Sequence, residues 1–273
     1  MPLSGHLEMS SSSDYWDVLA PHHLSIENNF LDLPSMRLIE ADIRQPVLVV
    51  GAGLGLIVEG LRRKGFRADG VDLSAEMVRY AKLRRGITVV RADARALPFG
   101  ELAYETVIYA TGVIDFMRDE EQIALILDEA RRVAGRSGKI FVAFYRFSAA
   151  SEGFLTRLGL LSDNVLSYRE TIEVYRLNPF QAISWVAKRA ETGYLRASIL
   201  SLSSLALSTN TERGAAFAMQ RLCRDTDHAE SMIKAAPERQ PYRNEPEIRD
   251  MFGRLAIPIK KLHTSRTCYI VQI

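Results

Sequence analysis

A glycine-rich loop between an apolar run and a helix is the feature that most restricts the fold of this chain. Val47–Val50 (VLVV) is a β-branched run after Pro46, and Gly51–Gly55 (GAGLG) follows it directly. Such a run predicts a strand buried on both faces of a parallel sheet. Leu56–Lys64 then has the pattern of a helix. Glycines at this turn let the backbone bend tightly and let a ligand approach, and the helix N-terminus offers N–H groups to an anion.

Strand-like and helix-like segments continue to alternate after this loop. The further strands expected are Ala68–Leu73, Ile87–Arg91, Thr106–Tyr109 and Lys139–Phe144. The helices between them are one that Ser74 caps and one over Asp119–Val133. This alternation predicts a doubly wound parallel sheet with helices on both faces.

The C-terminal segments differ from this pattern. Pro246–Leu255 predicts a helix, and Ile257–His263 and Thr267–Ile273 predict two strands. Their connection is too short for a parallel crossover, so these two strands must be antiparallel. The predicted fold class is α/β: a Rossmann-like, doubly wound, mostly parallel seven-stranded sheet with an antiparallel C-terminal hairpin and an inserted helical cap.

Three parts follow from this reading. Residues 1–46 are expected to form an N-terminal helical lid, with helices over Asp14–Ala20 and Leu33–Ile43. Residues 47–147 and 242–273 form the Rossmann-like core. Residues 148–241 are too long for a structureless loop and are mostly apolar or helix-forming, so they predict an inserted helical substrate cap.

Composition excludes several classes of protein. The chain has 273 residues, with 35 Lys and Arg against 33 Asp and Glu, which gives no global attraction to nucleic acid or to an anionic membrane. Cys223 and Cys268 are too few for a disulfide framework, and the histidines have no metal-ligand spacing, so no metal is expected. Neither a signal peptide nor a membrane-spanning run is recognisable, so a soluble, cytoplasmic protein is expected.

An acidic residue after the second strand indicates a nucleoside ligand. Asp72 stands seventeen residues after Gly55, where a carboxylate can accept both hydroxyls of a ribose. The dinucleotide fingerprint requires glycine at the sixth loop position, where this chain has Leu56. A dinucleotide-dependent dehydrogenase therefore remains only an alternative.

The chain resembles the class I S-adenosylmethionine-dependent methyltransferases, especially the branch similar to ubiquinone and menaquinone C-methyltransferases. Five segments carry the resemblance, in order: VLVVGAGLG, GVDLSAEMVRYAK, RADARALPF, YETVIYATGVIDF and EARRVAGRSGKIFVAF. The family usually has an acidic residue two positions before the first glycine, where this chain has Val49. An inactive scaffold or sensor that binds S-adenosylmethionine is therefore a second alternative.

The resemblance implies S-adenosylmethionine as the cofactor and assigns residues to it. Asp72 would bind the ribose, Asp93 would meet the adenine amino group, and Ala94 would lie beside the ring. Tyr15 or Trp16, in an N-terminal helix, would lie near the cationic sulfonium. The full set expected to bind the cofactor is Tyr15, Gly51, Ala52, Gly53, Gly55, Asp72, Leu73, Met77, Asp93, Ala94 and Thr111.

Methyl transfer mainly requires that a nucleophile be placed behind the methyl group. Where the acceptor must lose a proton, the candidate bases are Asp115, after the fourth strand, and His23 or its neighbour His22. The apolar cap suggests a small, hydrophobic or lipid-like acceptor, with no nucleic-acid partner. A basic amphipathic helix within Ala182–Leu207 could rest on a membrane. The acceptor atom and the oligomeric state do not follow from the sequence.

Overall fold

The computed structural model describes residues 14–22, 33–115, 117–207, 210–224 and 226–273. The chain divides into two compact units. Unit 1 comprises the described part of Met1–Phe30 together with Phe147–Tyr242, and unit 2 comprises Leu31–Arg146 and Arg243–Ile273. The boundary between the units falls within residues 1–46, which the sequence analysis treats as one lid. The action of this segment as a lid stays a prediction.

Unit 2 is built on a seven-stranded sheet with the order β3-β2-β1-β4-β5-β10-β9. Its strands are β1 (Val47–Val50), β2 (Ala68–Asp72), β3 (Val90–Arg91), β4 (Thr106–Tyr109), β5 (Lys139–Tyr145), β9 (Lys261–Thr264) and β10 (Cys268–Gln272). The first five strands pair in parallel, and β10 is antiparallel to both β5 and β9. The predicted fold class is confirmed.

The centre of the sheet is buried on both faces, since every residue of β1 and β4 is buried. In β1, Leu48 and Val50 join one hydrophobic cluster, and Val47 and Val49 join the other. Helices α5 (Glu120–Ala134) and α12 (Glu245–Arg254) supply side chains to the first cluster. Helices α2 (Leu33–Met36), α3 (Leu56–Arg63) and α4 (Ala75–Arg85) supply the second, together with Ile39 and Ile43, which flank the 3₁₀ turn η1 (Glu40–Asp42). The result is the three-layered arrangement that is typical of doubly wound folds.

Local sequence signals set the helix ends. The Ser74 hydroxyl accepts a hydrogen bond from the Met77 N–H at the start of α4, and the Asp119 carboxylate accepts one from the Glu121 N–H at the start of α5. Gly86, with φ of 69°, ends α4. These caps fix where each helix begins or ends relative to the strand edges.

Three predicted elements of unit 2 are wrong in extent. The helix expected over Leu33–Ile43 is instead the short α2 and η1. The third strand is limited to Val90–Arg91, because Ile87 and Val89 pack into the core ahead of the paired residues. The strand expected from Ile257 begins at Lys261, because Lys261 already pairs with Gln272, the last residue of β10.

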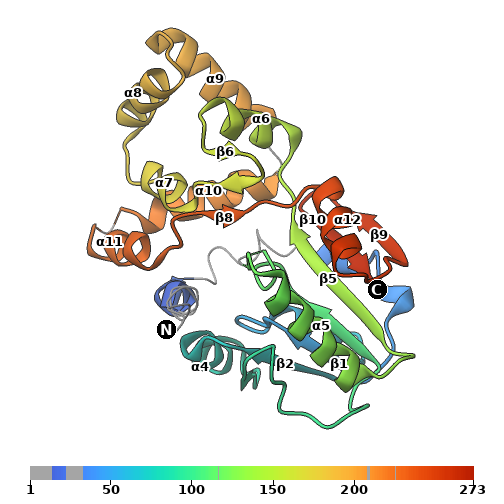
Figure 1. Cartoon of the computed structure of the whole chain (residues 1–273). Helices are drawn as coiled ribbons and strands as arrows, with labels where there is room; N and C mark the ends of the chain where they lie inside the picture. The colour runs from blue at the N-terminus through green and yellow to red at the C-terminus, as the bar shows by residue number, and fades with distance from the viewer. Residues whose placement is uncertain (1–13, 23–32, 116, 208–209, 225) are drawn as a thin grey trace, which may run out of the picture. The chain divides into compact units, whose positions relative to one another are not determined.

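Unit 1 is mostly helical, as expected, but it also contains a small sheet (Figure 1). A helix spans residues 14–22. The further elements are α6 (Ala149–Arg157), β6 (Leu161–Ser162), β7 (Val165–Leu166), α7 (Tyr168–Val174), α8 (Pro179–Arg189), α9 (Tyr194–Leu207), α10 (Asn210–Leu222), α11 (Thr226–Ala235) and β8 (Gln240–Pro241). The sheet has the order β6-β7-β8 and is antiparallel. Asp163 and Asn164, both with positive φ, make the tight turn between β6 and β7.

No helix in the described ranges is long and apolar enough to cross a lipid bilayer.

The core of unit 2 depends on the segment that follows unit 1 in the chain. Phe252 of α12 is 1% exposed, and its ring meets Phe144 of β5 edge to face at a centroid distance of 6.3 Å. We expect Phe252→Ala to lower the free energy of unfolding by about 3–5 kcal/mol through the lost burial and the cavity. Urea denaturation measures this change.

The matched control is Phe180→Ala, because the Phe180 side chain is 76% exposed. We expect this control to change the free energy of unfolding by less than about 0.5 kcal/mol. Equal effects of the two substitutions would contradict the assignment of α12 to the core.

Candidate functional site

The loop after β1 adopts a conformation that requires glycine at three positions. Gly51, Gly53 and Gly55 have φ values of 72°, 52° and 83°. A Cβ on Gly51 would lie 2.2 Å from Val113 Cγ2, so this glycine also permits close packing. A Cβ on Gly53 would meet no described atom within 4 Å. Gly53 therefore presents bare backbone to open space, as a site of ligand approach requires.

Asp72, at the end of β2, holds this loop in place. Its Oδ2 accepts a hydrogen bond from the Gly53 N–H at 2.8 Å, and its Oδ1 accepts one from the Ser74 N–H at 2.9 Å. The carboxylate thus joins the glycine loop to the start of α4. Because an ionised carboxylate has about four acceptor positions, these two bonds are compatible with further bonds from ribose hydroxyls.

The loop lies at the switch point of the sheet. β1 pairs with β2 on one side and with β4 on the other, and the chain visits β2 and β3 before it returns to β4. In open α/β sheets, ligands bind in the crevice beyond the carboxyl ends of the strands at this point. The approach of Val113 to Gly51 brings the β4–α5 loop beside the glycine loop.

Asp93, expected at the adenine, forms a close ion pair. Arg95 Nε donates to both Asp93 oxygens at 3.0 and 3.1 Å, and Arg95 Nη1 donates to Gln122 Oε1 at 2.7 Å. The Arg95 guanidinium lowers the pKa of Asp93 from its ordinary value, so this carboxyl stays ionised. Ala94 packs partly buried against the core. The adenine roles of Asp93 and Ala94 stay predictions.

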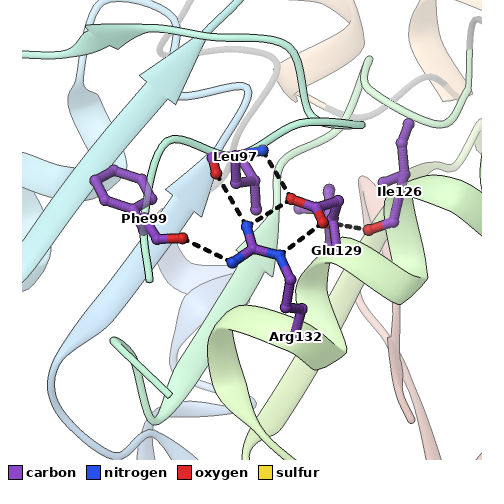
Figure 2. Close-up of polar contacts among 6 residues, drawn as sticks. Leu97, Phe99, Ile126, Glu129 and Arg132 are labelled. Carbon is purple, nitrogen blue, oxygen red and sulfur yellow. Dashed lines mark hydrogen bonds and ion pairs between the residues drawn. The ribbon is translucent and has the colours of Figure 1, made fainter. Parts of the chain in front are cut away.

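A clamp on α5 fixes the segment that follows Asp93 (Figure 2). Arg132 donates to the carbonyl oxygens of Phe99 and Leu97 at 2.8 and 3.0 Å. Glu129 Oε1 accepts from Arg132 Nε at 2.7 Å, and its Oε2 accepts from the Leu97 N–H at 2.8 Å. Three backbone groups of one loop are thus satisfied by two neighbouring side chains, which holds the Asp93 side of the site against α5.

Asp115 lies buried within the β4–α5 loop, at 3% exposure. Its Oδ2 accepts from the Gly112 N–H at 2.7 Å, and its Oδ1 accepts from the Tyr145 N–H at the end of β5 at 3.1 Å. Burial raises the pKa of Asp115 to about 6, although both backbone bonds and the charge of Arg243 oppose the rise. This geometry makes Asp115 a residue that positions the loop. Its role as a general base stays a prediction.

Arg243 holds the same loop from the other end. Its guanidinium donates to the carbonyl oxygens of Ile114 at 3.2 Å and Met117 at 2.5 Å. Because Arg243 is the first residue of unit 2 after unit 1, the returning chain is tied directly to the loop beside the site.

The N-terminal candidates lie in unit 1. The Tyr15 hydroxyl is 3.0 Å from the Tyr168 hydroxyl, and the Tyr15 ring is packed in a cluster with residues of α7, α10 and α11. The His22 ring lies 4.0 Å, centroid to centroid, from that of His228. The proximity of Tyr15 to a sulfonium stays a prediction, and His23 lies outside the described residues.

The remaining candidates are spread around the carboxyl ends of β1, β2 and β4. Leu73 is 37% exposed just after β2, whereas Met77 is buried at 2% on α4. Ala52 is buried in the loop itself, and Thr111 is partly buried after β4. Their contacts with a cofactor stay predictions.

Sequence reasoning missed four polar side chains that shape this site. They are Arg95, Glu129, Arg132 and Arg243. The spacing of Glu129 and Arg132 is that of an ordinary ion pair on a helix surface, and Arg243 has no local signal. Only the tertiary contacts show which backbone groups they bind.

The raised pKa of Asp115 predicts how stability depends on pH. Because the folded pKa of about 6 exceeds the ordinary 3.8, the fold favours the protonated carboxyl, and this group lowers the free energy of unfolding as pH rises from 4 to 6. In Asp115→Asn this contribution disappears. Urea unfolding at several pH values measures the effect. Over this range the free energy of unfolding of the variant should rise relative to that of the wild type by about 1.4 kcal/mol for each unit by which the folded pKa of Asp115 exceeds its unfolded pKa.

The control is Asp128→Asn, which removes a carboxylate whose side chain is 69% exposed. If Asp115→Asn and the wild type kept parallel stabilities across this range, the raised pKa would be refuted.

Comparison with known proteins shows what the region around this site is similar to. Residues 47–138 match a protein family described as a methyltransferase domain. The chain is 30% identical over 110 residues to a demethylmenaquinone methyltransferase of Thermobifida fusca, covering 38% of this chain and 45% of that protein. It is 30% identical over 159 residues to a ubiquinone biosynthesis O-methyltransferase of Xanthomonas oryzae pv. oryzae, covering 52% of this chain and 63% of that protein. The chain therefore spans about half the length of these relatives.

Similarity to solved structures concerns the fold alone. A protein of Rhodobacter sphaeroides with the provisional name of a Zn-dependent alcohol dehydrogenase has a TM-score of 0.58 at 13% identity, covering 96% of each chain. In the described part of the present chain, no group of three or more His, Cys, Asp or Glu residues is placed to hold a metal ion. The absence of a metal from the protein stays a prediction. The sheet order and the glycine loop are those of a Rossmann-like fold, and residues 47–138 are similar to a methyltransferase domain.

Proposed function

We propose that this protein transfers a methyl group from S-adenosylmethionine to a small, lipophilic organic acceptor. The observation that carries the proposal is the contact between Gly53 and Asp72, in which a bare backbone turn and a ribose-type carboxylate meet at the switch point. The match of residues 47–138 to a methyltransferase domain supports the same conclusion.

The residues present fit this cofactor. Backbone N–H groups of the glycine loop and of the α3 N-terminus suit a carboxylate, and the acceptor positions of Asp72 suit ribose hydroxyls. Val49 is fully buried and apolar, so backbone carbonyls at the loop would hold the cofactor's amino group. When bound, the cofactor would supply a methyl group activated by a sulfonium.

The protein's own contribution is placement. The clamp of Glu129 and Arg132 holds the Asp93 side, and Asp115 and Arg243 hold the β4–α5 loop. Fixing the reacting groups in line can lower the barrier by up to about 7–11 kcal/mol without acid–base chemistry. Asp115, which is buried and accepts hydrogen bonds from two backbone N–H groups, fits a reaction that depends on such placement.

The acceptor class rests on the names of two relatives. The relatives reported above are named for demethylmenaquinone and for ubiquinone biosynthesis. Extraction of labelled methyl groups into organic solvent after incubation with quinol precursors would test this class.

The Asp72 carboxylate gives the first test of the cofactor site. We expect Asp72→Ala to weaken S-adenosylhomocysteine binding at least about tenfold in calorimetric titration, because it loses ribose bonds worth about 1.5–3 kcal/mol each. The control is Asp69→Ala on the same strand, whose side chain is 56% exposed and should leave affinity unchanged.

Two outcomes would reject the proposal. One is equal affinity of Asp72→Ala and the wild type. The other is saturable binding of NADH by a folded protein that does not bind S-adenosylhomocysteine, which would favour a dehydrogenase.

Substitution of Gly53 gives a second test, of whether the ligand lies close to the backbone of the glycine loop. We expect Gly53→Ala to fold and yet to bind S-adenosylhomocysteine at least about tenfold more weakly, because the new methyl group occupies the approach space. The left-handed backbone should cost about 1–2 kcal/mol of stability in addition.

Gly65→Ala is the matched control for backbone strain. Gly65 has φ of 87° and no described atom within 4 Å of an added Cβ, but it lies at the far end of α3. We expect it to lose similar stability with unchanged affinity. Loss of affinity in both variants would mean that strain, and not ligand approach, explains the Gly53 result.

A further inference from the structure

Among the described residues, the chain passes between the two units at two places, each within one peptide bond. Unit 1 resumes at Phe147, directly after Arg146, and it ends at Tyr242, directly before Arg243. The passage between residues 30 and 31 lies outside the described residues. Because no linker separates the units at the two described passages, the residues on either side of each peptide bond fix each other's backbone.

The two passages meet in unit 1 through a pair of stacked aromatic rings. The Phe147 and Tyr242 rings lie 5.0 Å apart, centroid to centroid, with an interplanar angle of 29°. Tyr242 is 5% exposed, its N–H donates to the Asn164 carbonyl at 2.8 Å, and its hydroxyl donates to Glu152 Oε2 at 3.4 Å. Tyr242 is thus held by the β6–β7 turn, by α6 and by Phe147, which fixes the point where the chain leaves unit 1.

In unit 2, the residue next to Tyr242 binds the loop after β4. The Arg243 guanidinium donates to the carbonyl oxygens of Ile114 and Met117 at 3.2 and 2.5 Å. A planar guanidinium can bind two carbonyl groups at once, whereas the ammonium of lysine is a compact group on a flexible chain. Arg243 therefore fixes this loop at two points.

The same loop touches the glycine loop. Val113 lies so close to Gly51 that a Cβ on this glycine would be 2.2 Å from Val113 Cγ2. Asp115 holds the loop together and ties it to β5, because it accepts hydrogen bonds from the Gly112 and Tyr145 N–H groups. A shift of the β4–α5 loop would therefore change the packing of the glycine loop, where the cofactor is proposed to bind.

The other passage is anchored at a different part of the sheet. The Arg146 N–H donates to the Thr267 carbonyl at 2.9 Å, and Arg146 Nη1 donates to the Ser265 carbonyl at 2.9 Å. Both acceptors lie in the turn between β9 and β10, which stand at one end of the strand order. The side chain of Arg146 thus anchors the sheet edge, whereas that of Arg243 anchors the β4–α5 loop.

We propose that Arg243 is a positioning residue for the cofactor site and that the Phe147–Tyr242 stack of unit 1 controls it. The inference rests on the proposed function, because it concerns the affinity for S-adenosylmethionine. The stack fixes the backbone before Arg243, Arg243 fixes the β4–α5 loop, and Val113 in this loop packs against Gly51. A state of unit 1 that opens the stack releases the loop and weakens cofactor binding.

Calorimetric titration of the full-length protein with S-adenosylhomocysteine tests the inference. We expect Arg243→Gln to weaken binding at least about tenfold, because two charge-assisted hydrogen bonds to the loop are lost. Arg243→Lys should weaken it about threefold, since lysine keeps the charge and can bind one carbonyl. Tyr242→Ala should weaken it about threefold to fivefold, although Tyr242 belongs to unit 1.

Two further measurements show whether Tyr242 acts through Arg243. In the Arg243→Gln background, Tyr242→Ala should change the affinity by less than about 1.5-fold, because residues that act through one network are not additive. Hydrogen exchange of the amides of residues 112–115, measured without ligand, should be faster in both single variants than in the wild type. A residue that stabilised unit 1 alone would add its effect independently and leave this exchange unchanged.

The matched controls are Trp185→Ala in unit 1 and Arg249→Gln in unit 2. Trp185 is a partly buried aromatic residue of another cluster, and the Arg249 side chain on α12 is 53% exposed. We expect both variants to keep the affinity of the wild type and its exchange rates in residues 112–115. Circular dichroism checks that every variant is folded.

Failure of the inference can be told from failure of the proposed function. A folded wild type that binds no S-adenosylhomocysteine would reject the proposed function and this inference with it. A wild type that binds, together with Arg243→Gln or Tyr242→Ala variants that bind equally well, would overturn the inference alone. Additive effects in the double variant, or an equal loss of affinity in Trp185→Ala, would also overturn it.

Discussion

The two hydrogen bonds of the Asp72 carboxylate are the interaction on which the site depends. One oxygen holds the Gly53 N–H and the other holds the Ser74 N–H, so a single side chain fixes both the loop after β1 and the start of α4. The arrangement requires β1 and β2 to be adjacent and parallel, and they pair in this way from Val47 with Ala68 to Val50 with Val71. The sheet thus sets the position of the carboxylate, and the carboxylate sets the loop.

The other side of the site is held in the same manner, by side chains that bind backbone groups. Arg132 and Glu129 bind the loop after β3, and Asp115 and Arg243 bind the loop after β4. Loops that carry ligand contacts are intrinsically variable, so their geometry must be fixed from the scaffold. Here the anchoring groups come from α5, from the β4–α5 loop itself and from the first residue after unit 1.

The strands that make the centre of the sheet could be predicted within about a residue, because burial on both faces leaves an unmistakable apolar run. Pairing at the sheet edges could not be predicted, because the segment before Val90 buries its side chains outside the ladder and β9 meets the last residue of β10 already at Lys261. The β6–β7 hairpin was missed although Asp163 and Asn164 carry a turn signal, because its strands have only two residues each. Asp72 and the glycines could be predicted, because they stand at fixed places after the first two strands. The burial of Asp115 and the hydrogen bonds of Arg243 to the β4–α5 loop depend on contacts between residues distant in sequence.

The central claim is that Asp72 and the glycine loop together hold the nucleoside of S-adenosylmethionine. A crystal structure of the protein with S-adenosylhomocysteine tests it most directly. The account predicts ribose hydroxyls within about 2.5–3.0 Å of the Asp72 carboxylate oxygens and the ligand lying against the open side of Gly53. A ligand bound elsewhere, or a ribose that makes no contact with Asp72, would contradict it.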